Sequence, residues 1–256
     1  MAIRHLLRII GGVLLSLGTV RAGDSSAART VAWPDSFLAR VEATALLQTL
    51  NAELLSHDSA TATLEHWCDV HRLASPPRIV AERVPGIDKA PSSEQRRELD
   101  VAPTEPVRYR RVRLLCGTLV LSEADNWYVP ARLTPEMNKL LDTSDVPFGK
   151  AVKALRFQRH TLSSALLWLP LPEGWEMSPA EMPDHGAQLS IPSSVLEHRA
   201  VLSLPDGTPF SEVVETYTHN VLAFAMPPMP PMPVGSAPAS NSPQTFAVGG
   251  VNAPPQ

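Results

Sequence analysis

Four arginines lie close together in the sequence, and their spacing could create a site for a carboxylate. Arg108, Arg110, Arg111 and Arg113 alternate with aromatic and apolar residues. If the stretch is a strand, Arg111 and Arg113 share one face and Arg108 and Arg110 the other, so at least one pair faces the covered side or an edge. A buried guanidinium needs an anion, and its planar fork matches a carboxylate. The alternative is a solvated face with internal partners such as Glu105.

A carboxyl group in a second strand-like stretch could act as an acid. Glu215 is surrounded mainly by apolar residues. Loss of water disfavours the charged form of a carboxyl group, so Glu215 could keep its proton near neutral pH and donate it to a leaving group. Glu212, on an earlier rung of the same strand, is an alternative acid. Either residue could instead lie on the solvent face of an edge strand.

A third candidate element is the segment Pro147-Phe148-Gly149. Glycine permits close approach of the backbone, and amides that enter a helix favour an anion, so Phe148 and Gly149 could contact a ligand. Turns of this composition are abundant, so the motif is weak alone. Arg159 follows in a strand-like stretch and is either a second anion contact or a surface charge.

The order of these elements resembles that of the chorismate pyruvate-lyase family, whose enzymes remove pyruvate from chorismate to leave 4-hydroxybenzoate. The matching blocks are Asp58-Ser59-Ala60 and the segments 109–116, 147–149 and 214–217. The resemblance covers about residues 35–222 and is carried by block order more than by identity. It implies a six-stranded antiparallel sheet with helices packed on one face, and a ligand enclosed between the two layers.

The resemblance also implies a role for each block. Aligned on Leu114-Leu115-Cys116, Arg111 falls where the family keeps the arginine that holds the substrate carboxylate. Phe148 and Gly149 would donate backbone amides, and Glu215 would be the catalytic acid. No cofactor is implied, because expulsion of pyruvate with aromatisation needs mainly positioning and proton transfer. The ligand would be a small aromatic or cyclohexadiene carboxylate.

Two features favour a second interpretation: residues 1–22 have the pattern of an export signal, and the segment 122–130 departs from the usual residues of the family's second central strand. The match also needs an extra residue between Gly207 and Glu215, and Ala60 stands where the family often has a larger apolar residue. The same fold resembles the ligand-sensing domain of some transcription regulators, so the scaffold can hold small molecules without turnover. The alternative is therefore an exported, non-catalytic binding protein for small aromatic carboxylates.

Other kinds of site find no support in the sequence. His57, His66 and His71 are not at a helical metal-ligand spacing, and there is no zinc-protease, Gly-x-Ser-x-Gly or phosphate-loop motif, so we expect no metal and no nucleotide. Cys68 and Cys116 do not form a Cys-x-x-Cys motif. They could pair in an oxidising compartment or remain two separate buried thiols, because the sequence does not fix their separation.

The elements that must position these residues follow from periodicity and turn residues. Helical spacing begins at Phe37, and a second helix is expected after an N-cap at Asp58 or Ser59. Residues 86–106 and 169–192 are expected to be loops. Helices followed by strands with short turns favour an α+β fold with an antiparallel sheet. Strands are expected at 79–84, 109–115, 118–129, 155–167, 196–204 and 210–218, the last two joined by Asp206-Gly207.

The two ends of the chain are interpreted separately from this domain. Residues 1–22 combine a basic start, an apolar run and a small-residue cleavage pattern, which is typical of a secretory signal, so we expect a periplasmic or secreted protein. Residues 23–34 are a linker and 35–225 the domain. The uncharged Pro/Met-rich tail, 226–256, is expected to be disordered, or to dock on a Pro-binding partner.

The charge of the chain argues against two classes of partner. The signal removes three of the 22 basic residues and none of the 26 acidic ones, which leaves a mature net charge of −7. A net-acidic domain without a basic run is a poor candidate for binding nucleic acid or an anionic membrane. The expected partner is a small carboxylate ligand.

Overall fold

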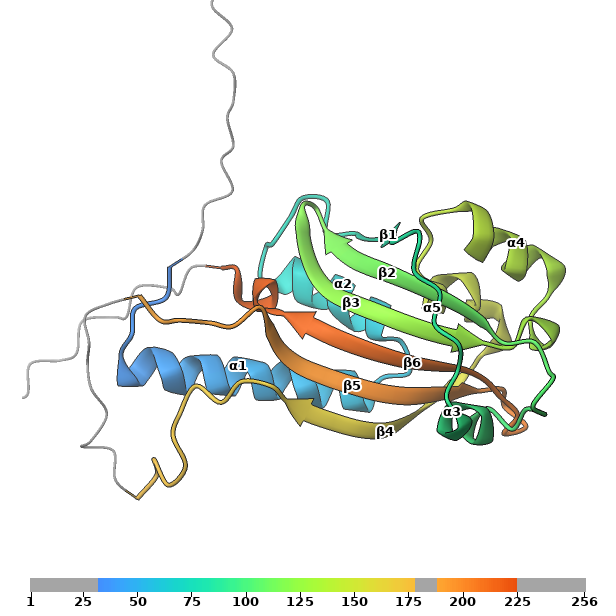
Figure 1. Cartoon of the computed structure of the whole chain (residues 1–256). Helices are drawn as coiled ribbons and strands as arrows, with labels where there is room; N and C mark the ends of the chain where they lie inside the picture. The colour runs from blue at the N-terminus through green and yellow to red at the C-terminus, as the bar shows by residue number, and fades with distance from the viewer. Residues whose placement is uncertain (1–31, 178–187, 225–256) are drawn as a thin grey trace, which may run out of the picture.

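In the part of the chain that the structure describes, residues 32–177 and 188–224, six antiparallel strands form one sheet in the order β1-β2-β3-β6-β5-β4 (Figure 1). This computed structural model confirms the predicted α+β class. The predicted signal peptide, the tail 226–256 and most of the linker lie outside the described residues. The strands are β1 (Ile79–Arg83), β2 (Arg108–Cys116), β3 (Leu119–Tyr128), β4 (Gln158–Leu166), β5 (Ser194–Ser203) and β6 (Pro209–Thr218).

Two glycines make the tight turns that join neighbouring strands. Gly117 lies between β2 and β3 with a φ of 58°, and Gly207 lies between β5 and β6 with a φ of 88°. Glycine adopts this left-handed region without steric cost. A Cβ at position 117 would also come within 2.8 Å of the Cβ of Ala74. The turn at Gly207 is the one that Asp206-Gly207 predicts.

Two helices, α1 (Phe37–Ser56) and α2 (Ala60–Val70), cover one face of the sheet (Figure 1). The hydroxyls of Ser36 and Ser59 accept hydrogen bonds from amides of the first turns, each at 3.3 Å, and so cap the two helices. Ser59 is thus the N-cap of α2. None of the helices within 32–177 and 188–224 is both long enough and apolar enough to cross a bilayer.

The buried stripe of α1 differs from the predicted one. The predicted stripe includes Phe37, Val41 and Ala45, but the first two are half-buried and Ala45 is exposed. Two alanines take the covered positions of the first turns, because small side chains let the helix approach its neighbours closely. Val70, predicted to be buried, is 58% exposed at the end of α2. The residues that α1 buries are Ala39, Ala43, Leu47, Leu50 and Leu54.

A second apolar cluster closes one end of the sheet. The ring of Phe210 lies at its centre, with the rings of Phe148 and Phe157 at centroid distances of 6.4 Å and 6.2 Å. These contacts hold α5 against the sheet. The elements around the cluster include α4 (Pro135–Thr143), α5 (Phe148–Ala151) and the 3-10 turns η1 (Pro130–Arg132) and η2 (Lys153–Leu155).

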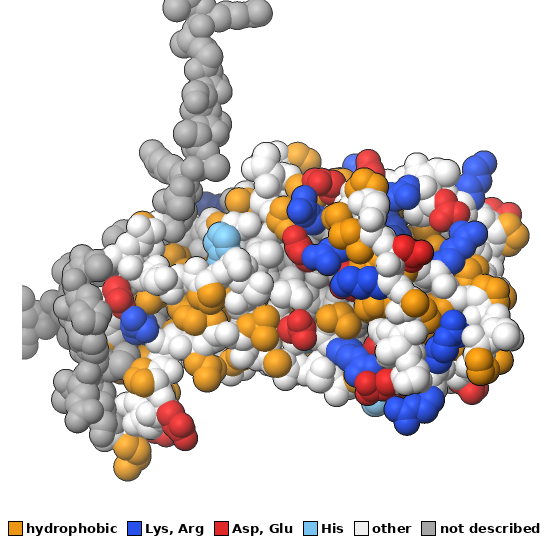
Figure 2. All heavy atoms as spheres, viewed as in Figure 1, with side chains coloured by type: hydrophobic (Ala, Val, Ile, Leu, Met, Phe, Trp, Pro, Cys, Tyr) orange, Lys and Arg blue, Asp and Glu red, His pale blue; other side chains and the backbone are white. Residues whose placement is uncertain are grey.

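The segment predicted as a surface loop at 86–106 contains a helix, α3 (Ser93–Glu98), on the face of the sheet opposite α1 and α2 (Figure 1). A capping box starts it, because Ser92 and Gln95 exchange side-chain-to-backbone hydrogen bonds. Gln95 then donates to the buried Glu212 of β6 at 3.3 Å. Figure 2 shows acidic and basic side chains interspersed on this side, over β2, β3 and α3.

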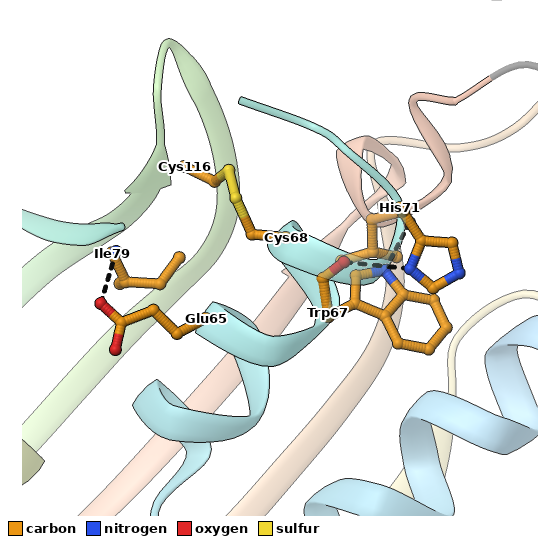
Figure 3. Close-up of a disulfide and its surroundings, with 7 residues drawn as sticks. Glu65, Trp67, Cys68, His71, Ile79 and Cys116 are labelled. Atoms are coloured by element: carbon orange, nitrogen blue, oxygen red, sulfur yellow. Dashed lines mark hydrogen bonds between the residues drawn. A yellow bond between two sulfur atoms is a disulfide. The ribbon is translucent and has the colours of Figure 1, made fainter. Parts of the chain in front are cut away.

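A disulfide between Cys68 and Cys116 joins α2 to the end of β2 (Figure 3). Their Cα atoms are 6.3 Å apart, and both side chains are fully buried. Of the two alternatives that the sequence left open, the structure therefore shows the paired one. Nearby, Glu65 of α2 accepts from the amide of Ile79 at 3.1 Å, which attaches the same helix to β1.

Two tryptophans attach the last described segment of the domain to the first described segment and to α2. Trp33 donates to the carbonyl of Leu222 at 3.0 Å, and Trp67 donates to the carbonyl of Val221 at 2.8 Å; both acceptors lie in the 3-10 turn η4 (His219–Leu222). The ring of Phe224 meets Trp33 edge-on, with centroids 6.1 Å apart. The two ends of the described domain therefore lie together.

Candidate functional site

A cavity lies between the sheet, the N-terminal end of α2 and α5. All four sequence blocks contribute to its wall: the segment 58–60 before and at the start of α2, Arg110 of β2, Phe148 and Gly149 of α5, and Glu215 of β6. The volume open to the centre of a water molecule is about 40 Å³. The apolar part of the wall consists of Val112, Leu114, Ala124, Phe157, Leu202 and Val213.

Arg110 brings a buried positive charge to this cavity. It is 7% exposed, and its Nη2 donates to the carbonyl of Val146 at 3.1 Å. Its Nε is buried and has no hydrogen-bond partner among the described residues. Burial, followed by repulsion from Arg83, lowers the pKa of Arg110 to about 10, so the group is still charged at neutral pH. A buried cation of this kind has unused capacity for an anion.

Arg111, the predicted carboxylate-binding residue, lies on the opposite face of the sheet. It forms ion pairs with Glu123 at 2.7 Å and with Asp125 at 3.6 Å. Successive residues of a strand alternate between faces, and in β2 the buried positions are Arg110, Val112, Leu114 and Cys116. The assignment of Arg111 to the cavity is therefore wrong by one residue, and Arg110 takes its place.

Glu215 lies in the cavity wall, as predicted, but it is already engaged. Its carboxylate pairs with the guanidinium of Arg159 at 2.7 Å, with side chains 7% and 4% exposed respectively. Burial alone would lower the pKa of Arg159, but Glu215 and Tyr217 raise it overall. The hydroxyl of Tyr217 donates to the same carboxylate at 3.2 Å. Proton donation by Glu215 would first require this pair to open.

The sequence left the positions of Arg159 and Glu212 open, and the structure places one in the cavity wall and the other on the opposite face of the sheet. Arg159 is a cavity residue rather than a surface charge, and its Nε is buried without a hydrogen-bond partner among the described residues. Glu212, the alternative acid, faces α3 instead and pairs with Arg199 at 2.8 Å. Three positions separate Glu212 from Glu215, so the two carboxylates lie on opposite faces of β6.

Asn126 of β3 lines the cavity and was not predicted from the sequence. It lies directly across from Arg110 in the β2–β3 ladder, so the two side chains are neighbours on one face. The hydroxyl of Ser211 donates to its Oδ1 at 2.8 Å, which fixes the orientation of the amide. Its NH₂ group makes no hydrogen bond within the described part of the chain. The polar stretch 122–126 was the available signal, because a polar residue facing a covered side needs a partner.

Phe148 and Gly149 lie where the start of α5 meets the start of α2. A Cβ at position 149 would come within 3.3 Å of the Ser59 hydroxyl, so glycine allows this close approach. The ring of Phe148 also packs 5.6 Å from the ring of Tyr128, centroid to centroid. The structure thus puts both predicted residues in the wall, and their backbone amides as ligand donors stay a prediction.

A buried histidine continues the polar network beyond the cavity. His198 is fully buried, and its Nε2 donates to Asn51 Oδ1 at 2.8 Å, while Nδ1 has no partner among the described residues. Burial, followed by repulsion from Arg159, lowers the pKa of His198 to about 4 against the attraction of Glu215. His198 is therefore neutral at pH 7.

This lowered pKa predicts that acid destabilises the fold. The unfolded chain binds a proton at His198 near pH 6.5, but the folded chain does so only near pH 4. The contribution of neutral His198 to the free energy of unfolding is therefore fully present above pH 6.5 and is lost as the pH falls from 6.5 to 4. The expected loss is about 3 kcal/mol. Urea unfolding at pH 7.5 and pH 4.5 measures it. His198→Gln keeps a donor for Asn51 and cannot titrate, so an equal pH dependence in this variant would contradict the assignment.

Comparison with known proteins identifies one family. No family model matches the chain. The Uncharacterized protein y4mC of Sinorhizobium fredii (strain NBRC 101917 / NGR234) is 56% identical over 216 residues, which cover 84% of this chain and 90% of that protein. The chain belongs to the y4mC family. The resemblance of this y4mC-family chain to the chorismate pyruvate-lyases remains an interpretation of its sequence blocks.

Solved structures are similar to this y4mC-family chain only at a low level. PhnF from Mycobacterium smegmatis has a TM-score of 0.41 and 13% identity, with 67% of this chain and 69% of that chain covered. A possible transcriptional regulator, YydK from Bacillus subtilis, has a TM-score of 0.35 and 16% identity over 56% of this chain and 59% of that one. A GntR-family transcriptional regulator from Enterococcus faecalis V583 has a TM-score of 0.35 and 14% identity, with 54% of this chain and 93% of that chain covered. Similarity at this level establishes no shared function.

Proposed function

We propose that this domain binds a small carboxylate in the cavity between α2, α5 and the sheet. The observation that carries the proposal is the buried guanidinium of Arg110, which lines the cavity and whose Nε has no hydrogen-bond partner among the described residues. Burial of an uncompensated charge costs several kcal/mol, so an anion that enters the cavity recovers a large interaction. A carboxylate matches the planar fork of the guanidinium.

The neighbouring polar groups favour a ligand with one negative charge. Arg159 is already neutralised by Glu215 at 2.7 Å, which leaves Arg110 as the cation with unused capacity in the inner wall. Asp58, at the exposed rim, accepts from the backbone amide of Arg159 at 2.9 Å. The NH₂ group of Asn126 and the backbone amides of Phe148 and Gly149 would add hydrogen bonds to the bound carboxylate.

Arg110→Gln tests this function, with Arg111→Gln as the matched control. The first removes the cavity cation and the second an arginine on the opposite face, one residue away. Charge-assisted hydrogen bonds contribute about 1.5–3 kcal/mol, so Arg110→Gln should weaken carboxylate binding at least about tenfold, whereas Arg111→Gln should not. Calorimetric titration with acetate, glycolate and benzoate measures the affinities. Equal loss in both variants, or binding of none of the acids by the parent protein, would refute the proposal.

A second candidate function is removal of pyruvate from chorismate or a related enol ether. The observation that favours it is the convergence of all four blocks on one cavity with Glu215 in the wall. The Arg159–Glu215 pair and the small volume weigh against it. Incubation of the protein with chorismate, with the absorbance of 4-hydroxybenzoate followed over time, tests this activity. Absence of product with well-folded protein would exclude the activity, and turnover that survives in Glu215→Gln would exclude Glu215 as its acid.

We also propose that the protein acts in the periplasm or outside the cell. The signal-like pattern of residues 1–22 supports this location, and so does the buried disulfide, because such bonds persist in oxidising compartments and are rare in the cytosol. The mature chain recovered from the host should lack about the first 22 residues. An intact N-terminus in a cytosolic fraction would contradict the proposal.

A further inference from the structure

The size of the cavity limits what it can hold, if the carboxylate-binding function proposed above is correct. The volume open to the centre of a water molecule is about 40 Å³. One water needs about 10–15 Å³ by this measure, so about three waters fit. Three waters displace roughly 90 Å³ of liquid, which is the volume of a short acid and well below that of an aromatic one.

The aromatic wall keeps the cavity at this size. Phe157 and Phe148 line it, and both rings pack on Phe210 behind them, at centroid distances of 6.2 Å and 6.4 Å. Phe210 itself is fully buried. A larger ligand would have to displace rings that already have packed neighbours, and displacement from a close-packed interior is costly.

The hydrogen-bond donors of the cavity are divided between two positions. Arg110 and Asn126 are cross-strand neighbours on β2 and β3, so they can bind one carboxylate together. Arg159 reaches the cavity from β4, with a buried Nε that has no partner in the described residues. Its guanidinium donates to Glu215 through Nη2, and its remaining donors can bind a second oxygen. The charge of Arg159 is already balanced by Glu215, so the second oxygen is best matched by an uncharged hydroxyl or carbonyl.

We propose that the cavity selects a short hydroxy or oxo acid, of the size of glycolate or glyoxylate, over both plain and aromatic carboxylates. The carboxylate lies against Arg110 and Asn126, and the hydroxyl or carbonyl oxygen accepts from Arg159. This departs from the aromatic ligand that the family resemblance implies.

Three acids separate the two parts of this proposal in a calorimetric titration of the parent protein. Glycolate and acetate differ by the second oxygen, and benzoate differs in size. We expect glycolate to bind at least about tenfold more tightly than acetate, the contribution of one hydrogen bond to a charged donor, and benzoate to give no saturable binding. The Phe157→Leu variant, in which a smaller side chain enlarges the cavity, should bind benzoate more tightly than the parent protein does. Arg110→Gln locates the binding in the cavity.

Each outcome decides a separate point. Equal affinities for glycolate and acetate would overturn the second-oxygen contact. Benzoate binding that is tighter than that of glycolate and is lost in Arg110→Gln would overturn the size limit while leaving the carboxylate site intact. Binding of none of the three acids would remove the proposed function itself, and this inference with it.

Discussion

Replacing Cys68 and Cys116 together by alanine should lower the free energy of unfolding by about 4 kcal/mol, the entropy that a cross-link removes from the unfolded chain for a loop of this length. The two residues are separated by 48 positions, and both side chains are fully buried. Alanine avoids placing a hydroxyl group in the apolar core. A loss of this size is a large part of the 5–15 kcal/mol that typically separates a folded domain from its unfolded state.

Urea unfolding with and without reductant measures this effect and supplies its own control. Reductant should destabilise the parent chain by about the same amount and leave the double variant unchanged, because the variant has no bond to reduce. The reduced parent should also bind acids less well, since the bond joins α2 to β2, two elements of the cavity wall. Equal unfolding midpoints for parent and variant without reductant would show that the bond contributes nothing.

Replacing either Arg159 or Glu215 alone should lower the free energy of unfolding by about 3–5 kcal/mol, because each single change leaves a buried charge without its partner. Both side chains are at most 7% exposed, and their charged atoms are 2.7 Å apart. Arg159→Met and Glu215→Met each remove one partner at similar volume. The double variant should recover most of the loss, since an apolar pair of similar size replaces a buried ion pair at little cost.

A double-mutant cycle measured by urea unfolding separates the interaction between Arg159 and Glu215 from a simple loss of packing. The coupling energy should be several kcal/mol and favourable in the parent, with the double variant closer to the parent than either single one. If the effects of the two substitutions merely add, the groups do not depend on each other. A Glu123→Met and Arg111→Met cycle on the more exposed opposite face is the matched comparison, and it should yield less than about 1 kcal/mol.

The fold could be predicted from the sequence more completely than the site. The six strands follow from alternating apolar residues and from glycines at the turns, and the start of α2 follows from the expected N-cap at Asp58 or Ser59. The short helix α3 was missed because six residues carry little periodic signal. Its capping box, Ser92 to Gln95, was visible in the sequence and would have indicated it.

The error at the arginines has a physical cause. A strand places alternate residues on opposite faces, so a shift of one position moves a side chain to the other side of the sheet. Alignment on Leu114-Leu115-Cys116 chose Arg111. Alternation within the strand puts Arg110 on the face of Val112, Leu114 and Cys116, the more apolar set, and this signal identifies the buried arginine without an alignment.

The pairing of Arg159 with Glu215 could not be predicted in the same way. The two residues lie 56 positions apart, on strands separated by β5, and only the order of strands in the sheet brings them together. The size of the cavity likewise depends on how the rings of Phe148, Phe157 and Phe210 pack. Neither property is encoded in local spacing.

The anchoring of η4 by Trp33 and Trp67 has a practical consequence for work with this protein. The first and last described residues of the domain both lie near the N-terminal end of α1. This helix has 20 residues and is therefore about 30 Å long. Its C-terminal end is followed by the cavity segment 58–60. Affinity tags, fluorescent fusions or surface tethers joined directly to the ends of the described domain, at residues 32 or 224, therefore start far from the ligand entrance, so immobilised protein should titrate like free protein.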